Sequence, residues 1–269
     1  MAVLSVDLAF RRWSDLGIVV LNGSPAPSQG AADITKLAGV GPDLAEESPI
    51  QCEIIPWNDP GAVDANILAG RLNHLCGVNN IRVMMLDGPQ AWKSLSNGEQ
   101  HARVSERRLN TAGKTGLPGL VKPATYRAFT EFCVDVYDAL CRRGWRRLET
   151  REQPGSPQER VLVESYPHAA WRSLGIKPLP SKRLARVSDL ADAFASLRQI
   201  VPLAVNRPPN HDQLQAIVGG LPGLALEAHN TAGAQIVGKP PRREDGHWRE
   251  GFIVLPVAPH RVASQRLMN

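Results

Sequence analysis

Apolar and polar positions along the first ninety residues predict several strands with a helix inserted among them. Short apolar runs at residues 3–8, 17–21 and 52–55 predict three early strands. Apolar residues at helical spacing follow from Pro60, and the nearly continuous apolar run at residues 81–86 is typical of a central strand covered on both faces. This part of the chain is therefore expected to run strand, strand, strand, helix, strand.

The rest of the chain continues this mixture. The strongest helical pattern covers residues 125–143 and ends at Gly144, after two arginines that suit the helix dipole. Further strands are expected at 145–149, 160–165 and 252–257, and further helices at 167–174, at 188–200 and from 210 to about 221, where Pro222 ends or kinks the helix. No repeat or linker divides the chain, so we expect one α/β domain over residues 1–269.

Two stretches interrupt the pattern. Residues 22–50 are rich in Gly, Pro and Ser and predict an irregular insertion. Residues 88–123 show no period and carry many basic residues, so we expect a long, solvent-facing surface segment. Loops of this length in a compact domain are usually functional or disordered.

Composition places the chain among ordinary globular proteins. Hydrophobic residues make up 43% and charged residues 21%, which excludes global disorder, and the net charge of +5 permits a polyanionic partner without demanding one. The four cysteines lack zinc-site spacing, residues 1–10 lack the basic start of a signal peptide, and no apolar stretch reaches about twenty residues. We therefore expect a cytoplasmic protein with buried cysteines and no membrane partner.

Acidic residues stand at the ends of three predicted strands and at the start of a late helix. Asp7, Asp87 and Glu164 each follow an apolar run, and Asp212 opens the helix near residue 210. In an open α/β sheet, functional side chains gather beyond the carboxyl ends of the strands. Clustered carboxylates repel one another unless a cation neutralises them, and oxygen ligands suit Mg²⁺ or Mn²⁺. The four acids are therefore candidate catalytic residues and metal ligands, arranged to cleave a phosphodiester with one or two ions.

Each acid also has a purely structural interpretation. Asp87 is followed by Gly88 and Pro89, and this sequence favours a turn without any functional role for the acid. Asp212 suits the first turn of a helix because its charge complements the helix dipole. The metal-site hypothesis therefore depends on the joint placement of the four acids.

The acidic motifs occur in an order that resembles a known family. Asp7-Leu8-Ala9, Leu86-Asp87-Gly88-Pro89, Glu164-Ser165-Tyr166-Pro167-His168 and His211-Asp212 resemble, over nearly the whole chain, the domain-of-unknown-function family numbered 429. Its members are predicted nucleases of ribonuclease H-like (RNase H-like) fold. The resemblance implies a mixed five-stranded sheet with the first three strands antiparallel, helices on both faces, and Asp7 on the central first strand.

The chain departs from this family pattern on the last helix. In the family, and in the related Holliday-junction resolvases, that helix often carries two acids, whereas here Gln213 and Gln215 stand where acids are common. An amide brings no charge to offset a divalent cation, so metal affinity is expected to fall or one metal site to be lost. His211 and His168 could touch the site, but a position at a helix start explains both as well.

Basic residues cluster in the segment after the second predicted acid. Arg107, Arg108 and Lys114 are the candidate substrate-binding residues, because guanidinium and ammonium groups hold phosphates. A solvated charged face is the alternative interpretation. Three tryptophans are candidates either for stacking on bases or for the core: Trp57, Trp92 and Trp171.

Three function classes follow from these observations. The leading hypothesis is a divalent-metal-dependent phosphodiesterase or nuclease with nucleic acid as its candidate partner. The alternative is a catalytically weakened RNase H-like domain that binds nucleic acid or protein, which the two glutamines favour. An actin-like ATPase or sugar kinase would need a glycine-rich phosphate hairpin between the first two strands, and residues 10–15 do not form one.

Overall fold

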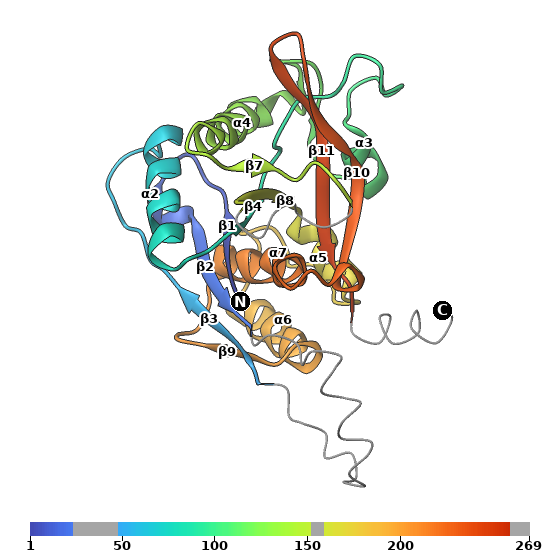
Figure 1. Ribbon diagram of the computed structural model, residues 1–269. Coiled ribbons are helices and arrows are strands. Elements are labelled where there is room, and N and C mark those ends of the chain that lie inside the picture. Colours follow the sequence, from blue (N-terminus) through green and yellow to red (C-terminus); the bar gives the residue numbers. More distant parts are fainter. Residues whose placement is uncertain (24–47, 152–158, 259–269) are drawn as a thin grey trace, which may run out of the picture.

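The computed structural model describes residues 1–23, 48–151 and 159–258 (Figure 1). Most of the expected insertion at 22–50 therefore lies outside the described residues. The strands are β1 (Ala2–Asp7), β2 (Gly17–Asn22), β3 (Ile50–Ile54), β4 (Val83–Asp87), β5 (Lys114–Thr115), β6 (Val121–Lys122), β7 (Arg146–Arg147), β8 (Val161–Ser165), β9 (Leu203–Val205), β10 (Ala234–Glu244) and β11 (His247–Pro256). The helices are α2 (Ala65–Val78), α3 (Val104–Leu109), α4 (Arg127–Cys141), α5 (Pro167–Ser173), α6 (Val187–Ile200) and α7 (His211–Glu227), with short 3-10 turns at Trp13–Asp15, Ala124–Tyr126 and Thr231–Gly233.

The described residues form one mixed sheet of nine strands and a separate two-stranded hairpin. The strand order of the mixed sheet is β10-β11-β8-β4-β1-β2-β3-β9, and β7 pairs with β8 beside this path. β2 runs antiparallel to β1, and β3 runs antiparallel to β2. On the other side of β1, β4 runs parallel to β1 and β8 runs parallel to β4. The RNase H-like α/β class is therefore confirmed, with β1 at its centre, but the sheet has nine strands where the resemblance implied five.

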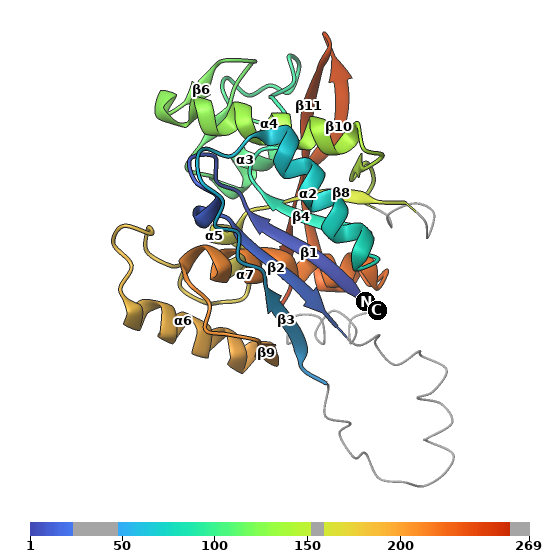
Figure 2. The ribbon, with the colours of Figure 1, turned by 90° about the vertical axis from the view of Figure 1, so that its left-hand side faces the viewer.

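Helices cover both faces of the sheet (Figure 2). Leu4 and Val6 of β1 point into a core shared with α2 and α4, and we call this side the α4 face. The alternate residues Val3 and Ser5 point to the opposite side, where α7 lies, and we call it the α7 face. There the Ser5 hydroxyl donates to the carbonyl oxygen of Ala216, 2.6 Å away. The two-residue period of each strand thus assigns every side chain to one of two cores.

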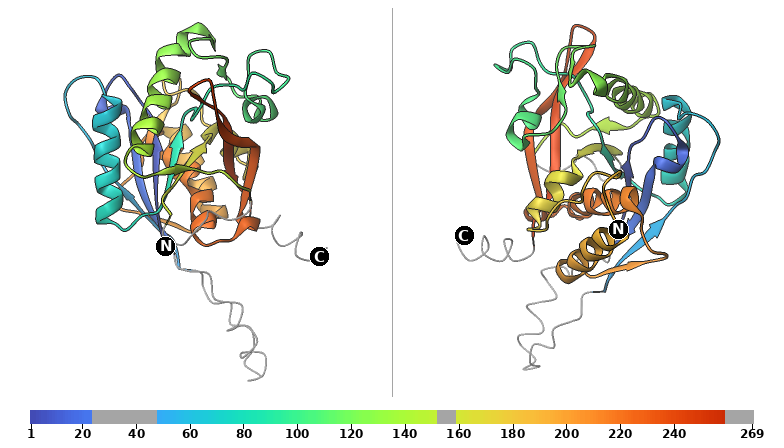
Figure 3. Two further views of the ribbon diagram at one scale, coloured as in Figure 1. Left: turned by 45° about the horizontal axis from the view of Figure 1, so that its top comes forward. Right: turned by 180° about the vertical axis from the view of Figure 1, so that it is seen from behind.

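Helix α7 crosses the sheet in close contact with β1, β2 and β4 (Figure 3). Close approach is possible because α7 presents glycines: a Cβ on Gly220 would lie 2.6 Å from the Cβ of Ser5. The helix was expected to end or kink at Pro222, but it continues unbroken to Glu227. Sheet packing along the whole helix outweighs the loss of one hydrogen bond at proline, which costs about 3 kcal/mol in an isolated helix.

Some other expectations also require correction. The strand expected at 145–149 shortens to the two residues of β7, and neither β9 nor β10 was expected. The segment 88–123 is not simply a surface loop, because it contains α3 and the β5–β6 hairpin and buries Gln90, Ser94 and Arg103. The β10–β11 hairpin lies beside α3 and extends beyond the sheet (Figure 1).

The cysteines lie where the sequence predicts them, in or near the core. All four cysteines are free; Cys52, Cys76 and Cys133 are buried and Cys141 is partly buried. Within the described ranges, no helix combines the length and apolar character needed to cross a bilayer.

Candidate active site

Asp7 and Asp87 end two neighbouring parallel strands at the centre of the sheet. The register of β1 and β4 pairs Asp7 with Asp87, and both side chains have the parity of Ser5 and therefore lie on the α7 face. Burial, followed by the charges of Asp87 and Asp212, raises the pKa of Asp7 well above its usual range. Burial also raises the pKa of Asp87 to about 7; a hydrogen bond from Asp7 opposes this rise, and the charge of Glu164 adds to it. The two carboxyls therefore share a proton, which protonated Asp7 donates to Asp87.

Asp212 approaches this pair from the first turn of α7. Asn210 caps the helix through a 3.0 Å hydrogen bond from the backbone N–H of Gln213, which fixes the turn that carries Asp212. The Asp212 carboxylate is buried and forms an ion pair with Lys182, which also contacts Asp15 at 2.8 Å. Because the charge of Asp212 raises the pKa of Asp7, the two carboxyls lie within electrostatic range.

Glu164 ends β8 next to Asp87 but is one residue out of phase with it. The register of β4 and β8 pairs Glu164 with Leu86, and pairs Asp87 with Ser165. Since neighbouring partners share a face, the Glu164 side chain leaves β8 on the side of Leu86, but its carboxylate lines the same cavity as Asp87 and its charge raises the pKa of Asp87. The three strand-end acids therefore lie near one another at one end of the sheet, and a metal shared by all three stays a prediction.

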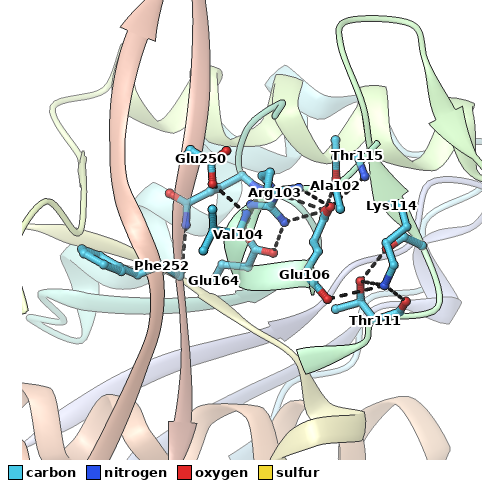
Figure 4. Close-up of polar contacts among 12 residues, drawn as sticks. Ala102, Arg103, Val104, Glu106, Thr111, Lys114, Thr115, Glu164, Glu250 and Phe252 are labelled. Carbon is cyan, nitrogen blue, oxygen red and sulfur yellow. Dashed lines mark hydrogen bonds and ion pairs between the residues drawn. The ribbon is translucent and has the colours of Figure 1, made fainter. Parts of the chain in front are cut away.

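A buried arginine, Arg103, forms an ion pair with the Glu164 carboxylate (Figure 4). Arg103 Nη1 donates to Glu164 Oε2 at 2.7 Å and Nη2 to Glu164 Oε1 at 2.6 Å, while Nε donates to Glu106 Oε1 at 3.0 Å. The backbone N–H of Gln90 adds a hydrogen bond of 3.0 Å to Glu164 Oε2. Burial raises the pKa of Glu164, and Arg103 opposes that rise.

Further contacts fix Arg103 in place (Figure 4). Glu106 accepts from the backbone N–H groups of Arg103 and Thr115, at 3.0 and 2.9 Å. Glu250 of β11 accepts from the backbone N–H of Val104 at 2.9 Å. In the sequence, Arg103 is one of many basic residues in the segment 88–123, although the spacing Arg103-x-x-Glu106 is that of two residues one helical turn apart.

Cations of the protein thus neutralise two of the four predicted metal ligands. Asp212 is paired with Lys182, and Glu164 with Arg103. Within the described ranges, no three His, Cys, Asp or Glu side chains are close enough together to hold a metal ion. The donor set that fits a divalent cation is therefore the Asp7–Asp87 pair, whose shared proton a cation would displace, with Asp212 nearby on the same face.

Ser165 takes the place beside Asp87 that Glu164 was expected to occupy. Its register partner is Asp87, and it faces α7, since a Cβ on Gly219 would lie 3.0 Å from its hydroxyl. The strand period identifies this residue once the register of β4 and β8 is known, but the sequence alone does not supply that register.

A cavity of about 230 Å³ opens beside the acids. Asp87 and Glu164 form one part of its lining, and Tyr126, Phe129 and Tyr166 form an aromatic part. The cavity is therefore lined by both carboxylates and aromatic rings, and it reaches Asp87 of the Asp7–Asp87 pair.

The predicted substrate-binding residues differ in their surroundings. Arg107 and Arg108 are exposed on α3, and Arg107 lies 3.7 Å from Glu99. Lys114 instead turns back onto its own loop and donates to the carbonyl oxygens of Thr111 and Glu106. Arg107 and Arg108 are thus available to an external phosphate, whereas Lys114 is engaged within the chain.

The two glutamines of α7 have structural partners. Gln213 Oε1 accepts from the backbone N–H of Asn210 at 2.9 Å, and Gln215 Oε1 accepts from the indole of Trp171 at 2.8 Å. His211 Nε2 lies 2.9 Å from the carbonyl oxygen of Pro180, and its Nδ1 lies 3.3 Å from Asp212.

The other candidates from the sequence are distributed between surface and core. His168 is exposed, and its ring lies tilted beside that of Tyr166 with the centroids 5.9 Å apart. Trp92 and Trp171 are buried, which supports the core interpretation for both, whereas Trp57 is partly exposed and packs against Trp13.

Comparisons with known proteins add little to this description. No protein-family model matches the chain, and no curated protein sequence matches it. Among solved structures, the chain is similar to RuvC of Thermus thermophilus, with a TM-score of 0.36 and 9% sequence identity, over 82% of this chain and 91% of that chain. The strand order and directions of the sheet are what place this chain in its fold class.

Proposed function

We propose that the protein is a divalent-metal-dependent hydrolase of phosphodiester bonds. The observation that carries the proposal is the Asp7–Asp87 pair, two adjacent carboxyls with raised pKa values at the carboxyl ends of central parallel strands. Raised pKa values at such a position are typical of functional sites, because isolated buried carboxylates are costly to the fold.

The proposed cofactor is Mg²⁺ or Mn²⁺, held by Asp7 and Asp87 with Asp212 close by. When bound, such an ion polarises a phosphoryl oxygen and acidifies a water. The residues of the chain do the rest: the Asp7–Asp87 pair must release its shared proton, and Lys182 holds Asp212 in position. Glu164 has no part in this ligand set, because Arg103 and Gln90 engage its oxygens.

Nucleic acid is the proposed substrate and partner. Arg107 and Arg108 are exposed on α3, in the segment that also carries Arg103 to the site, and would hold backbone phosphates. Membership of the family numbered 429 is part of the same proposal, supported by the ordered motifs and by the expected position of Asp7 on the central strand.

The test is cleavage of single- and double-stranded DNA and RNA with Mn²⁺. We expect Asp7→Asn to lower the cleavage rate by more than about 100-fold. Loss of a residue that only supports a metal ligand already lowers activity by about 10- to 100-fold, and Asp7 is proposed to be a ligand itself. The fold should survive, because asparagine has nearly the shape of protonated Asp7 and its amide can still donate a hydrogen bond to Asp87. Asp192→Asn, an exposed change on α6, is the matched control and should cleave like the wild type. Equal cleavage by Asp7→Asn would contradict the proposal.

The second candidate is a weakened RNase H-like domain that binds nucleic acid or a protein. Its supporting observation is that Lys182 and Arg103 pair with two of the four acids. This candidate predicts binding of oligonucleotides without Mn²⁺ and no cleavage with it. The same assay, read together with a binding isotherm, separates the two candidates.

A further inference from the structure

Arg103 is a guanidinium in the interior of the protein. Its side chain is only 1% exposed, although it belongs to the segment that the sequence places at the surface. Its three nitrogens contact two buried glutamates, Glu164 and Glu106. A buried charge persists only when it is paired and hydrogen-bonded, and this arginine is both.

Arg103 and a second metal ion would compete for the same carboxylate. Both oxygens of Glu164 accept from Arg103 in a two-point contact, and Oε2 also accepts from the backbone N–H of Gln90. Glu164 lines the same cavity as Asp87, but coordination of an ion would require its oxygens to leave these donors. The chain therefore does not fit a second ion at Glu164.

We propose that Arg103 supplies the positive charge that a second divalent ion would otherwise bring, so that the site takes a single ion at the Asp7–Asp87 pair. The inference rests on the proposed function, since it concerns how many ions that site holds. Arg103 acts as a positioning residue: it neutralises Glu164 and holds it away from the ion. Its charge is permanent, because guanidinium does not deprotonate in proteins.

The position of Arg103 is set by contacts on both sides of it. Glu106 accepts from its side chain and from its backbone N–H, and Glu250 accepts from the next backbone N–H at Val104. The guanidinium is therefore fixed before any ligand arrives, as an electrostatic group must be if it is to act without rearrangement.

The experiment counts Mn²⁺ ions by calorimetric titration and by the paramagnetic resonance of free Mn²⁺, without any nucleic acid. We expect one ion for the wild type and one for Arg103→Lys, which keeps a positive charge. Arg103→Met leaves Glu164 and Glu106 facing the vacated position, so we expect it to bind two ions and to gain more thermal stability from Mn²⁺ than the wild type does. Combining Arg103→Met with Glu164→Gln removes one of these carboxylates and should return the count to one.

Several outcomes would overturn the inference. Two ions in the wild type, or a single ion in folded Arg103→Met, would show that Arg103 does not stand in for an ion. If Arg103→Met fails to fold even with Mn²⁺, Glu164→Gln decides: it should still bind one ion, and loss of that ion would make Glu164 a ligand.

The count also separates this inference from the proposed function. One ion in the wild type without cleavage of any phosphodiester would contradict the function and leave the role of Arg103 standing. Two ions in the wild type together with cleavage would support the proposed function and contradict the role of Arg103. Binding of no ion at all would contradict both the function and the role of Arg103.

Discussion

At the scale of single residues, the chemistry centres on two carboxyls that share one proton. Asp7 and Asp87 are register partners on neighbouring strands, and burial raises the pKa of each. Like charges held side by side in a protein cannot both ionise without a cation, so the pair keeps a proton at neutral pH. Metal binding and proton release are therefore linked at this site.

We expect the metal-free protein to lose stability as the pH rises through about 7. The pKa of Asp87 is raised from 3.8 to about 7, so the folded state keeps a proton that the unfolded state releases. The stabilising contribution is complete below the unfolded pKa and is lost as pH rises through the folded one. Thermal melts with EDTA from about pH 4 to about pH 8 measure this slope.

Asp87→Asn should remove much of that slope and raise the melting midpoint in the alkaline half of the range. Asp192→Asn should keep the wild-type slope, because its side chain is exposed on α6. A slope in Asp87→Asn equal to that of the wild type would assign the pH dependence to other groups.

The sequence could predict that Asp7, Asp87 and Glu164 stand at strand ends, but not that Arg103 pairs with Glu164. All three follow apolar runs, which is the only signal that a single sequence offers. Whether a strand-end residue faces one core or the other depends on register, and Glu164 pairs with Leu86 rather than with Asp87. The sequence does not reveal the ion pair of Arg103 either, because its partner Glu164 lies 61 positions away in the chain.

At the scale of elements, the contact of α7 with the sheet positions Asp212. Gly220 and Gly223 allow the helix to lie directly on β1, where an added Cβ would come within 2.6 Å of Ser5 or 2.7 Å of Val3. Gly17 at the start of β2 likewise allows the first turn of α7 to approach the sheet closely, since a Cβ there would lie 2.2 Å from the carbonyl oxygen of Asp212.

Gly220→Ala should therefore destabilise the protein and displace Asp212. Overpacking of this kind costs roughly 1–3 kcal/mol. The matched control is Gly77→Ala in α2, where a Cβ meets nothing within 4 Å and the change should stabilise the helix by about 0.5–1 kcal/mol. Chemical denaturation measures both, and equal stabilities for the two variants would contradict the packing argument.

Elements with strong apolar patterns could be predicted, and edge elements could not. β1, β4 and β8 are buried on both faces, so their sequences are mostly apolar up to the acidic residues near their ends. β10 lies at the sheet edge and contains Pro240 and Pro241 among basic residues, so it lacks any alternation that predicts a strand. Its pairing with β11, which no local pattern encodes, makes it a strand.

At the scale of the whole molecule, Glu250 connects the last strand to the segment that carries Arg103. It is buried, and its carboxylate accepts from the backbone N–H groups of Ser94 and Val104, at 3.0 and 2.9 Å. It also accepts from the side chain of Asn97. One carboxylate thus holds both ends of residues 94–104 against β11.

Glu250→Ala should loosen this segment without unfolding the sheet. We expect faster hydrogen exchange across residues 93–109, because three donors lose their acceptor. Glu131→Ala on α4 removes only an exposed ion pair with Arg127 and serves as the control. Unchanged exchange in Glu250→Ala would show that the segment is held by its other contacts.

Binding of nucleic acid should depend on salt through the exposed face of α3. Each phosphate contact contributes about 0.9 to the slope of log affinity against log salt on duplex DNA, and about 0.7 on single strands. Replacing both Arg107 and Arg108 by alanine should lower the slope by up to twice that amount, almost equally for unrelated sequences. Metal affinity should stay the same, and an unchanged slope would mean that the two arginines form only a solvated face.

The central place of β1 has a consequence for how the protein folds. Ser5 bonds to Ala216 across 211 positions of sequence, so β1 is covered on this face only when α7 arrives. A topology dominated by such distant contacts folds slowly, because long loops must close before these contacts can stabilise anything. Until that step, Asp7 and Asp87 stay in water as ordinary ionised acids, so the shared proton is taken up late and late folding itself becomes sensitive to pH.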